Sequence, residues 1–318
     1  MGGVVPRPSL RAGRRTSEWV TFHCVNATPP SLGPRPIGEL RSEIVEALAT
    51  AGVPDPDVDA ELLLGHVLGL SRGGVQARVV MGGEVGEADA ATLASLVERR
   101  ARREPLQHLT GTAAFRSLEL VVGPGVFVPR PETEQVAQLA IDALRAAAEP
   151  EPIALDLGSG SGAIALALAT EVPHARVWAV ENSPEAFAWT RRNVAAVAAP
   201  NLQLVFGDLA DALPELDGRA AVVISNPPYI PLGAIPRDPE VRLYDPEHAL
   251  YGGPDGLDVV RVLSRRARAL LHPGGTLVIE HGEAQSAAIA EVLAADGWRA
   301  IAHHRDLTTR DRATTALR

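Results

Sequence analysis

The chain contains no lysine, because all 30 of its basic residues are arginine. This absence excludes a Schiff-base lysine, a lysine general base and the lysine of a phosphate-binding P-loop. The single cysteine, Cys24, excludes a disulfide within the chain and a zinc site built from cysteines. No apolar run approaches the roughly 20 residues that a membrane span requires, and no charged-then-apolar leader is present. We therefore expect a cytoplasmic protein that does not associate with a membrane.

Positive charge is also scarce, and it is unevenly distributed. The net charge of the 318 residues is −9. Residues 1–36 contain one acid, Glu18, and five arginines, so this segment carries +4 and the rest of the chain −13. Enzymes that act on nucleic acids usually neutralise phosphates with a basic surface. The acidic body therefore argues against a direct nucleic-acid substrate.

The chain divides by its sequence pattern into four segments. Residues 1–36 are rich in Pro, Gly, Ser and Arg without periodicity and predict a disordered extension. Apolar residues then recur at helical spacing from Ile37, from Asp57 to Leu70 and from Glu87 to Arg103, which predicts a small helical domain over 37–110. Residues 113–128 alternate and are broken by Gly123-Pro124-Gly125, so we predict a β-hairpin linker over 111–131. The last segment is 132–318.

Residues 132–318 alternate between helical and strand patterns. The helices are expected at 132–148, 162–171, 184–198, 256–271 and 284–296. The strands are expected at 153–157, 176–181, 202–207, 220–225, 275–280, 297–304 and 313–317. Such alternation predicts an α/β fold, a mostly parallel sheet with helices on both faces.

A glycine-rich turn follows the first of these strands. The strand ends in Asp156-Leu157, and the turn is Gly158-Ser159-Gly160-Ser161-Gly162. Glycines at alternate positions let a ligand approach the backbone at a helix N-terminus. The spacing differs from the dinucleotide-binding G-x-G-x-x-G and from the G-x-S-x-G nucleophile elbow. Taken alone, this turn is equally compatible with a tight structural turn.

Acidic residues at the next two strand ends favour the ligand-binding interpretation. Glu181 ends the second strand, where an acid can bind ribose hydroxyls. Asp208 follows the third strand and is succeeded by Leu209, where a carboxylate can accept a hydrogen bond from an adenine amine. Each acid alone would be interpreted as a surface or capping residue. Their recurrence at successive strand ends predicts one nucleoside-binding site.

The fourth strand ends in the tetrapeptide Asn226-Pro227-Pro228-Tyr229. Two prolines remove two backbone donors and keep the chain extended. The Asn226 amide, the Pro227 carbonyl and the Tyr229 ring are then free to face a ligand. This combination suits a flat, neutral group that bears nitrogen, such as a planar amide or an exocyclic base amine.

Together these motifs resemble the S-adenosylmethionine-dependent methyltransferases of the Rossmann-like class. Over residues 37–318 the chain is more specifically similar to the protein-(glutamine-N5) methyltransferases that act on peptide-chain release factors. The matching segments are 104–111 with Phe115, 128–134, 246–250, Gly252-Gly253, 255–257, Gly274-Gly275, Glu280, Gly282, Gln285, 306–308 and 311–312. The chain differs from the family pattern at Glu181, His281 and Thr309, and residues 1–36 have no counterpart.

The resemblance implies the roles of individual residues. S-adenosylmethionine would be bound, and S-adenosylhomocysteine released, without a metal. Asn226, Pro227 and Tyr229 would be catalytic, and Pro228 and Phe115 would also contact the substrate, with Phe115 covering the acceptor amide. Cofactor contacts are expected from Asn226 and from a further set: Arg130, Thr133, Asp156, Gly158, Ser159, Gly160, Ser161, Gly162, Glu181, Asp208 and Leu209.

The resemblance also implies a protein substrate, the glutamine of a Gly-Gly-Gln tripeptide in a translation release factor. The helical domain and the hairpin would bind this partner, and 132–318 would be the methyltransferase domain. Three alternatives stay open: a glutamine methyltransferase of a ribosomal protein, an RNA or DNA amino-methyltransferase, and a module that binds the donor without activity.

A cluster of arginines lies at the end of the third predicted helix, at Arg99, Arg100, Arg102 and Arg103. Cations at a helix C-terminus interact favourably with the helix dipole, which is the simpler interpretation. The alternative is contact with a partner or with RNA bound to it.

Overall fold

The computed structural model describes residues 34–318. The predicted extension therefore lies outside the described residues, except at its end. There Arg35–Pro36 forms strand β1, which pairs antiparallel with β2 (Glu84–Val85). Because Arg35 also forms an ion pair of 2.6 Å with Glu43, the prediction that the extension reaches residue 36 is wrong by about two residues.

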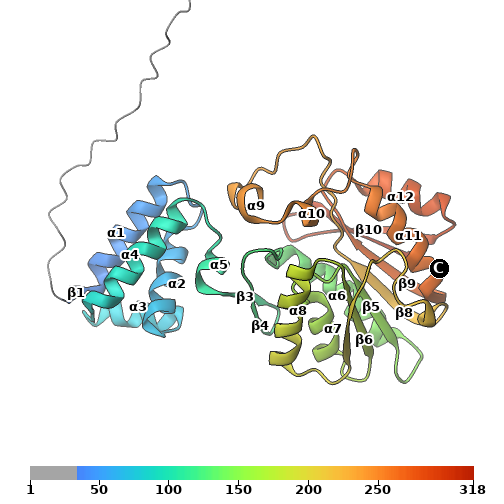
Figure 1. Ribbon diagram of the computed structural model, residues 1–318, viewed down its shortest axis with the longest axis horizontal. Helices are drawn as coiled ribbons and strands as arrows, with labels where there is room; N and C mark the ends of the chain where they lie inside the picture. The colour runs from blue at the N-terminus through green and yellow to red at the C-terminus, as the bar shows by residue number, and fades with distance from the viewer. Residues whose placement is uncertain (1–33) are drawn as a thin grey trace, which may run out of the picture.

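The first part of the described chain is helical (Figure 1). Its helices are α1 (Ile37–Thr50), α2 (Pro56–Leu68), α3 (Arg72–Val80), α4 (Glu87–Ala101) and α5 (Leu106–Thr110). Their apolar faces form a separate core around Ile37, Leu48 and Leu63. Three of these helices lie where the sequence predicts them, whereas α3 and α5 are additional. The assignment of this region as a domain stays a prediction.

A short hairpin connects the helices to the sheet, and it is smaller than predicted. Strand β3 (Thr112–Phe115) pairs antiparallel with β4 (Leu118–Val121). The turn falls at Arg116, whose φ of 54° is left-handed. Gly123-Pro124-Gly125 therefore follows the hairpin and does not form its turn. The prediction of strands extending to residue 128 is wrong, since residues 122–130 contain no strand.

The second part is a seven-stranded sheet of order β10-β11-β9-β8-β5-β6-β7. Its strands are β5 (Ile153–Leu157), β6 (Arg176–Glu181), β7 (Leu202–Phe206), β8 (Ala220–Ser225), β9 (Leu271–Glu280), β10 (Arg299–Arg305) and β11 (Asp311–Leu317). The five strands from β5 to β9 are parallel, and β11 is antiparallel to both β9 and β10. The predicted α/β class, a Rossmann-like sheet with an N-terminal helical region and a hairpin, is confirmed.

Helices cover both faces of this sheet because alternate strand residues point to opposite sides. On one face, α6 (Pro131–Ala146), α7 (Ala163–Glu171) and α8 (Pro184–Val197) pack on residues such as Ala154 and Val222. On the other face, α11 (Asp258–Leu270) and α12 (Ser286–Ala295) pack on their neighbours Leu155 and Val223. Among residues 34–318, every helix is too short or too polar to cross a lipid bilayer.

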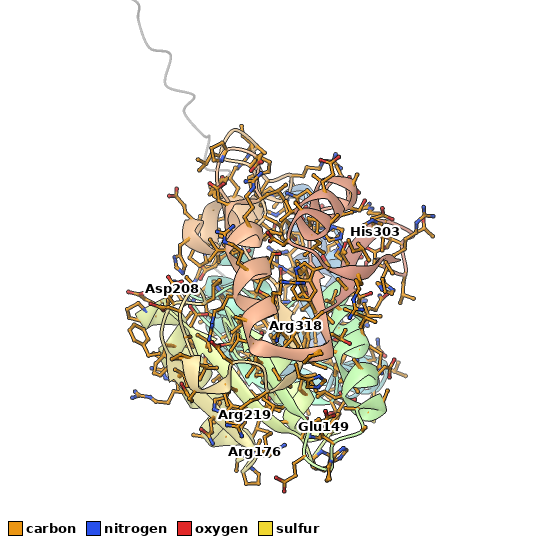
Figure 2. The ribbon with its side chains drawn as sticks, turned by 90° about the vertical axis from the view of Figure 1, so that its right-hand side faces the viewer. Glu149, Arg176, Asp208, Arg219, His303 and Arg318 are labelled. Carbon is orange, nitrogen blue, oxygen red and sulfur yellow. The ribbon has the colours of Figure 1, made fainter. Side chains whose placement is uncertain are left out.

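The carboxyl end of the parallel strands is the end at which the predicted site residues lie. Figure 2 shows Asp208, which follows β7, far from Arg176 and Arg219, which lie at the starting ends of β6 and β8. Between β8 and α11 the chain forms a long excursion with two short helices, α9 (Pro239–Tyr244) and α10 (Glu247–Leu250). A 3₁₀ turn, η1 (Pro214–Leu216), precedes β8.

Candidate active site

A cavity of about 1120 Å³ opens at the carboxyl end of the sheet. Thirteen of the sixteen predicted site residues line it: Arg130, Thr133, Gly158, Ser159, Gly160, Ser161, Glu181, Asp208, Leu209, Asn226, Pro227, Pro228 and Tyr229. Asp156, Gly162 and Phe115 do not. The cavity is large enough for a nucleoside-sized ligand together with a peptide side chain.

The glycine loop forms one wall of this cavity, and each glycine has a left-handed φ, of 80°, 57° and 84°. At Gly158 and Gly160 a Cβ atom would meet nothing within 4 Å, so both positions face open space. At Gly162 a Cβ atom would lie 2.7 Å from the Thr190 side chain. Gly162 therefore permits close packing of the loop on α8, while Gly158 and Gly160 keep the wall of the cavity bare.

Glu181 fixes the loop from the adjacent strand. Its Oε2 accepts a hydrogen bond of 2.7 Å from the Gly160 amide, and its Oε1 accepts one of 2.8 Å from the Ser183 amide. A carboxylate has about four lone-pair sites, so each oxygen keeps the capacity to accept from a ligand hydroxyl. Glu181 thus both shapes the loop and presents acceptors to the cavity.

Asp208 is held in a similar way at the end of β7. Its Oδ1 accepts from the Ala210 amide at 2.9 Å, and its Oδ2 accepts from the Asn182 side chain at 3.2 Å. Leu209 follows it on the same wall and packs against the core beneath. The pair offers a carboxylate beside an apolar surface, which suits a flat heterocycle with an exocyclic amine.

Asp156 and Gly162 lie behind the glycine loop, and neither lines the cavity. The Asp156 side chain is wholly buried, and its Oδ2 accepts a hydrogen bond of 3.0 Å from the Ala165 amide in the first turn of α7. Burial raises the pKa of Asp156 to about 7. Both residues shape the loop from behind, and their direct contact with the ligand stays a prediction.

Phe115 also lies away from the lining of the cavity. Its ring is fully buried in the core beneath the sheet, together with Leu120 and Val136, and it does not line the cavity. The alternation along β3 points Phe115 inward with Ala113, and leaves Ala114 exposed. In this structure the Phe115 ring packs in the core, and its contact with the acceptor amide stays a prediction.

The tetrapeptide Asn226-Pro227-Pro228-Tyr229 also lines the cavity and is held by close backbone packing. A Cβ atom on Gly252 would lie 2.3 Å from the Pro228 carbonyl oxygen, and one on Gly256 would lie 2.2 Å from that of Tyr229. Both glycines were identified from sequence only as family matches. Their structural reason is that only glycine lets the two backbones approach this closely.

Gln285 completes this support through its side-chain amide. Its Nε2 donates a hydrogen bond of 2.8 Å to the Tyr229 carbonyl, and its Oε1 accepts one of 2.9 Å from the Gly282 amide. Burial raises the pKa of the Tyr229 hydroxyl to about 12, so the ring is neutral. The tetrapeptide is thus presented in one fixed conformation.

Arg130 and Thr133 lie at the start of α6, where Pro131 occupies the first helical position. The Arg130 Nη2 atom forms an ion pair of 2.7 Å with Asp245, whose side chain is buried, and the guanidinium stacks over the Phe127 ring at 5.0 Å. Arg130 therefore ties the start of α6 to the excursion after β8 and lines that side of the cavity, and its predicted contact with the cofactor stays a prediction.

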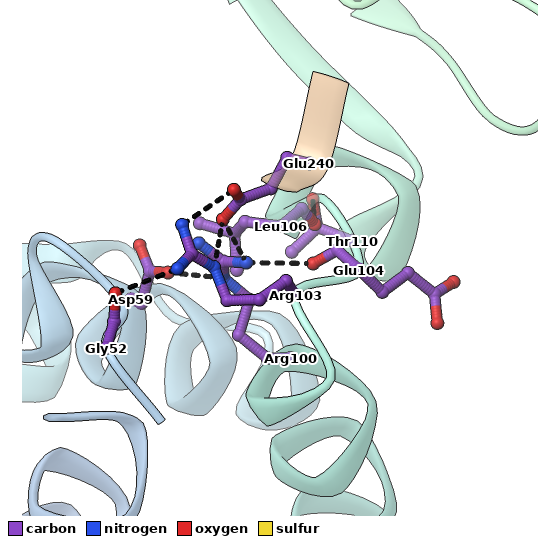
Figure 3. A network of polar contacts seen from close by, with 8 residues as sticks. All are labelled: Gly52, Asp59, Arg100, Arg103, Glu104, Leu106, Thr110 and Glu240. Carbon is purple, nitrogen blue, oxygen red and sulfur yellow. Dashed lines mark hydrogen bonds and ion pairs between the residues drawn. The ribbon is translucent and has the colours of Figure 1, made fainter. Parts of the chain in front are cut away.

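Two residues of the arginine cluster, Arg100 and Arg103, fasten the same excursion to the helical region (Figure 3). Glu240 of α9 accepts hydrogen bonds from Arg103 at 2.7 and 2.8 Å and from Arg100 at 2.8 Å. Arg100 also donates to Asp59 of α2 at 2.6 Å. Two members of the cluster thus form a bridge within the protein, whereas Arg99 pairs with Glu104 and Arg102 with Glu98. The predicted helix-dipole and partner contacts of the cluster stay predictions. Sequence patterns alone gave no signal for Glu240.

The sheet, the glycine loop after β5, the acid at the end of β6 and the acid after β7 define the class of the protein, a Rossmann-like methyltransferase that uses S-adenosylmethionine. Comparison with known proteins agrees with this class. The family model of the PrmC N-terminal domain matches residues 39–111, and that of the methyltransferase small domain matches residues 117–234.

Curated relatives identify the family. The chain is 50% identical to the release factor glutamine methyltransferase of Streptomyces coelicolor, over 87% of this chain and 97% of that one. It is 43% identical to that of Bifidobacterium longum, over 88% and 99% of the two chains. A solved methyltransferase from Pyrococcus furiosus is 21% identical with a TM-score of 0.48, over 69% and 98%. The chain belongs to the release factor glutamine methyltransferase family.

Proposed function

We propose that this chain transfers a methyl group from S-adenosylmethionine to the side-chain amide nitrogen (N5) of the glutamine in the Gly-Gly-Gln motif of peptide-chain release factors. The observation that carries the proposal is that the tetrapeptide 226–229 and the glycine loop follow neighbouring strands and line the same cavity. The names of the relatives support the choice of substrate.

The donor side of the cavity fits S-adenosylmethionine. Glycines without Cβ atoms leave room beside the loop, Glu181 keeps free acceptor sites for ribose hydroxyls, and Asp208 can accept from the adenine amine. S-adenosylmethionine supplies a methyl group that is already activated, so no nucleophilic side chain is required. S-adenosylhomocysteine would leave the same wall as the product, and no metal enters the scheme.

The acceptor side addresses the weakness of an amide as a nucleophile, whose nitrogen lone pair is delocalised by resonance. The Asn226 Oδ1 atom and the Pro227 carbonyl would accept hydrogen bonds from the two amide hydrogens. These bonds aim the nitrogen at the donor and stabilise the positive charge that develops on it. Tyr229 would pack on the amide plane, and Pro228 keeps the tetrapeptide extended. The proton then leaves to water or to Asn226.

A protein partner suits the rest of the surface. The body of the chain is acidic, which disfavours naked nucleic acid. The excursion after β8 carries the exposed apolar side chains Leu232, Ile235 and Leu243. These residues and residues 37–110 would bind the release factor. A release factor acts on the ribosome, so the proposal retains the predicted cytoplasmic location and needs no membrane partner.

The test is transfer of a labelled methyl group by the full-length protein to purified release factors, followed by peptide mass spectrometry. We expect label on the glutamine of Gly-Gly-Gln and none after that glutamine is replaced. Label on a ribosomal protein alone, or on RNA or DNA alone, would establish one of the rival methyltransferases. Donor binding without any transfer would establish a binding module.

Donor binding is tested separately by calorimetry with S-adenosylhomocysteine in the presence of a metal chelator. Loss of one hydrogen bond to a charged group weakens binding by about tenfold, so we expect that effect from Asp208→Ala. The matched control is Asp211→Ala, which removes an exposed aspartate that does not line the cavity. Failure of the unsubstituted protein to bind would refute the donor site.

A further inference from the structure

Glu280 is a buried carboxylate that the mechanism above does not use. It is the last residue of β9 and is only 1% exposed. Within residues 34–318 its Oε2 atom has no hydrogen-bond partner. A buried carboxylate is costly without partners, and such groups cluster at functional sites. Glu280 is therefore a candidate for a functional role beside the cavity.

The strand register places Glu280 next to Asn226. Strands β8 and β9 are parallel, and Ser225 pairs with Ile279. One residue further, Asn226 and Glu280 stand side by side, and neighbouring residues of paired strands point to the same face of the sheet. The Asn226 and Thr133 side chains are close enough to favour the charged form of Glu280.

An asparagine side chain needs such a neighbour to be useful at this position. Its amide can turn over and present either its oxygen or its NH₂ group to the cavity. Only the oxygen can accept a hydrogen bond from the substrate amide. A carboxylate beside the NH₂ group holds the orientation in which the oxygen faces the substrate.

We propose that Glu280 is a positioning residue whose carboxylate accepts a hydrogen bond from the Asn226 side chain and turns the Asn226 oxygen toward the acceptor amide. Its negative charge also polarises the Asn226 amide, which strengthens the oxygen as an acceptor when positive charge develops on the substrate nitrogen. This inference rests on the proposed function for its catalytic consequence, but not for the contact itself.

The surroundings of Glu280 make this orientation sensitive to pH. Besides Asn226 and Thr133, it is faced by Glu132 of α6, Tyr229 and Arg312 of β11. Burial and the repulsion of Glu132 raise the pKa of Glu280 to about 7, against the attraction of Arg312. A protonated Glu280 can donate to the Asn226 oxygen and so hold the amide in the reverse orientation. Turnover should therefore fall as the pH drops below about 7.

The first experiment tests the contact without any protein substrate. The carboxyl carbon of Glu280 is titrated by NMR in the unsubstituted protein and in Asn226→Ala. Loss of the donor should raise the pKa of Glu280, because its charged form loses a hydrogen bond. An unchanged titration in Asn226→Ala would refute the inference, whatever the substrate of the enzyme.

The second experiment tests the consequence with the release factor that the unsubstituted protein methylates. We expect Glu280→Gln to lower kcat roughly tenfold and to abolish the acidic limb near pH 7, and Glu280→Ala to lower kcat further. Donor affinity, measured by calorimetry, should stay within about twofold of that of the unsubstituted protein. This result would also show that both variants are folded.

The matched control is Glu291→Gln, an exposed residue of α12 that should leave kcat and the pH profile unchanged. Glu280 variants that transfer at the normal rate with the normal pH profile would overturn the inference while leaving the proposed function intact. Equal losses in kcat and donor affinity would also overturn it, because they indicate a structural role.

Discussion

Substitution of Glu240 tests most directly how the helical region supports the active site, because it breaks the ion pairs that join the two. Its carboxylate joins α9 to Arg100 and Arg103 of the helical region (Figure 3). The three side chains are 12%, 7% and 18% exposed. Burial alone would raise the pKa of Glu240, but the hydrogen bonds from Arg103 and Arg100 outweigh it and lower the pKa. Glu240 is therefore charged at neutral pH.

Replacing Glu240 by Gln removes the charge at nearly constant volume. Breaking a fully buried ion pair costs about 3–5 kcal/mol. The loss here should be smaller, about 2 kcal/mol, because Arg103 is accessible enough for water to replace the carboxylate. Arg100 also keeps its bond to Asp59, and Arg103 keeps one of 2.9 Å to the Gly52 carbonyl. A loss of about 2 kcal/mol corresponds to roughly 30-fold more frequent opening.

Hydrogen–deuterium exchange on peptides from residues 231–251 measures that opening directly. We expect roughly 30-fold faster exchange there in Glu240→Gln, with little change in β5 and β6. The KM for the release factor should rise while donor affinity stays constant, because Glu181 and Asp208 are held by hydrogen bonds at the ends of β6 and β7 that do not involve the excursion.

The matched control is Glu98→Gln, which breaks an exposed ion pair with Arg102, in which the two side chains are 71% and 60% exposed. Such a pair contributes about 0.3–0.5 kcal/mol, so its effect on exchange should be small. Exchange in Glu240→Gln that matches the unsubstituted protein would refute the idea that this bridge holds the excursion.

Three further predictions test the site. Gly256→Ala should abolish methyl transfer, because its Cβ atom would lie 2.2 Å from the Tyr229 carbonyl oxygen. Gly218 has a similar φ and open space around it, so the control Gly218→Ala should cost only about 1 kcal/mol of stability. Equal effects of the two substitutions in transfer and unfolding assays would contradict this prediction. Asn226→Ala should lower kcat about a hundredfold with little change in donor affinity, and Asn226→Asp should retain more activity than Ala if accepting is what matters; near-normal turnover in Asn226→Ala would remove the mechanism. Burial raises the pKa of Asp156 to about 7, so its contribution to stability is full below about pH 4 and is lost as the pH rises toward 7. In urea unfolding at pH 5 to 8, Asp156→Asn should therefore reduce the dependence of the free energy of unfolding on pH. An unchanged dependence would show that Asp156 does not titrate in this range.

The central strands were predictable from sequence because local signals defined both of their ends. Strands 153–157, 176–181 and 220–225 have the predicted bounds. The first is followed by Gly158, and the other two by an asparagine with a proline within two residues, Asn182 and Asn226. Burial on both faces makes each run nearly continuous in apolar residues. The start of β9 lacks this signal, and this strand begins at Leu271, four residues before the predicted start at 275.

The elements that the sequence did not predict depend on tertiary contacts. The α3 helix contains Gly73 and Gly74, which weaken a helical pattern, and α9 is six residues long. A helix that short is unstable alone, and α9 is held by Glu240. For the same reason the inward direction of Phe115 could not be deduced, since its face depends on the register of a hairpin whose turn was misplaced.

The strand order explains why a donor site and an acceptor site share one cavity. In sequence, the glycine loop and the tetrapeptide 226–229 are separated by β6 and β7. In the sheet, β8 returns to lie directly beside β5, with Asp156 opposite Ile224, and Ser225 donates a hydrogen bond of 2.5 Å to the Leu157 carbonyl. The strand order thus reverses at β5, with β6 and β7 on one side of it and β8 on the other. Crevices form at the carboxyl ends of the strands at such a switch point. The residues that bind the donor and those that bind the acceptor are therefore adjacent because of the order of the strands. A change within either motif should affect one of the two ligands, whereas a change at the β5–β8 contact, such as loss of the Ser225 hydroxyl, should affect both.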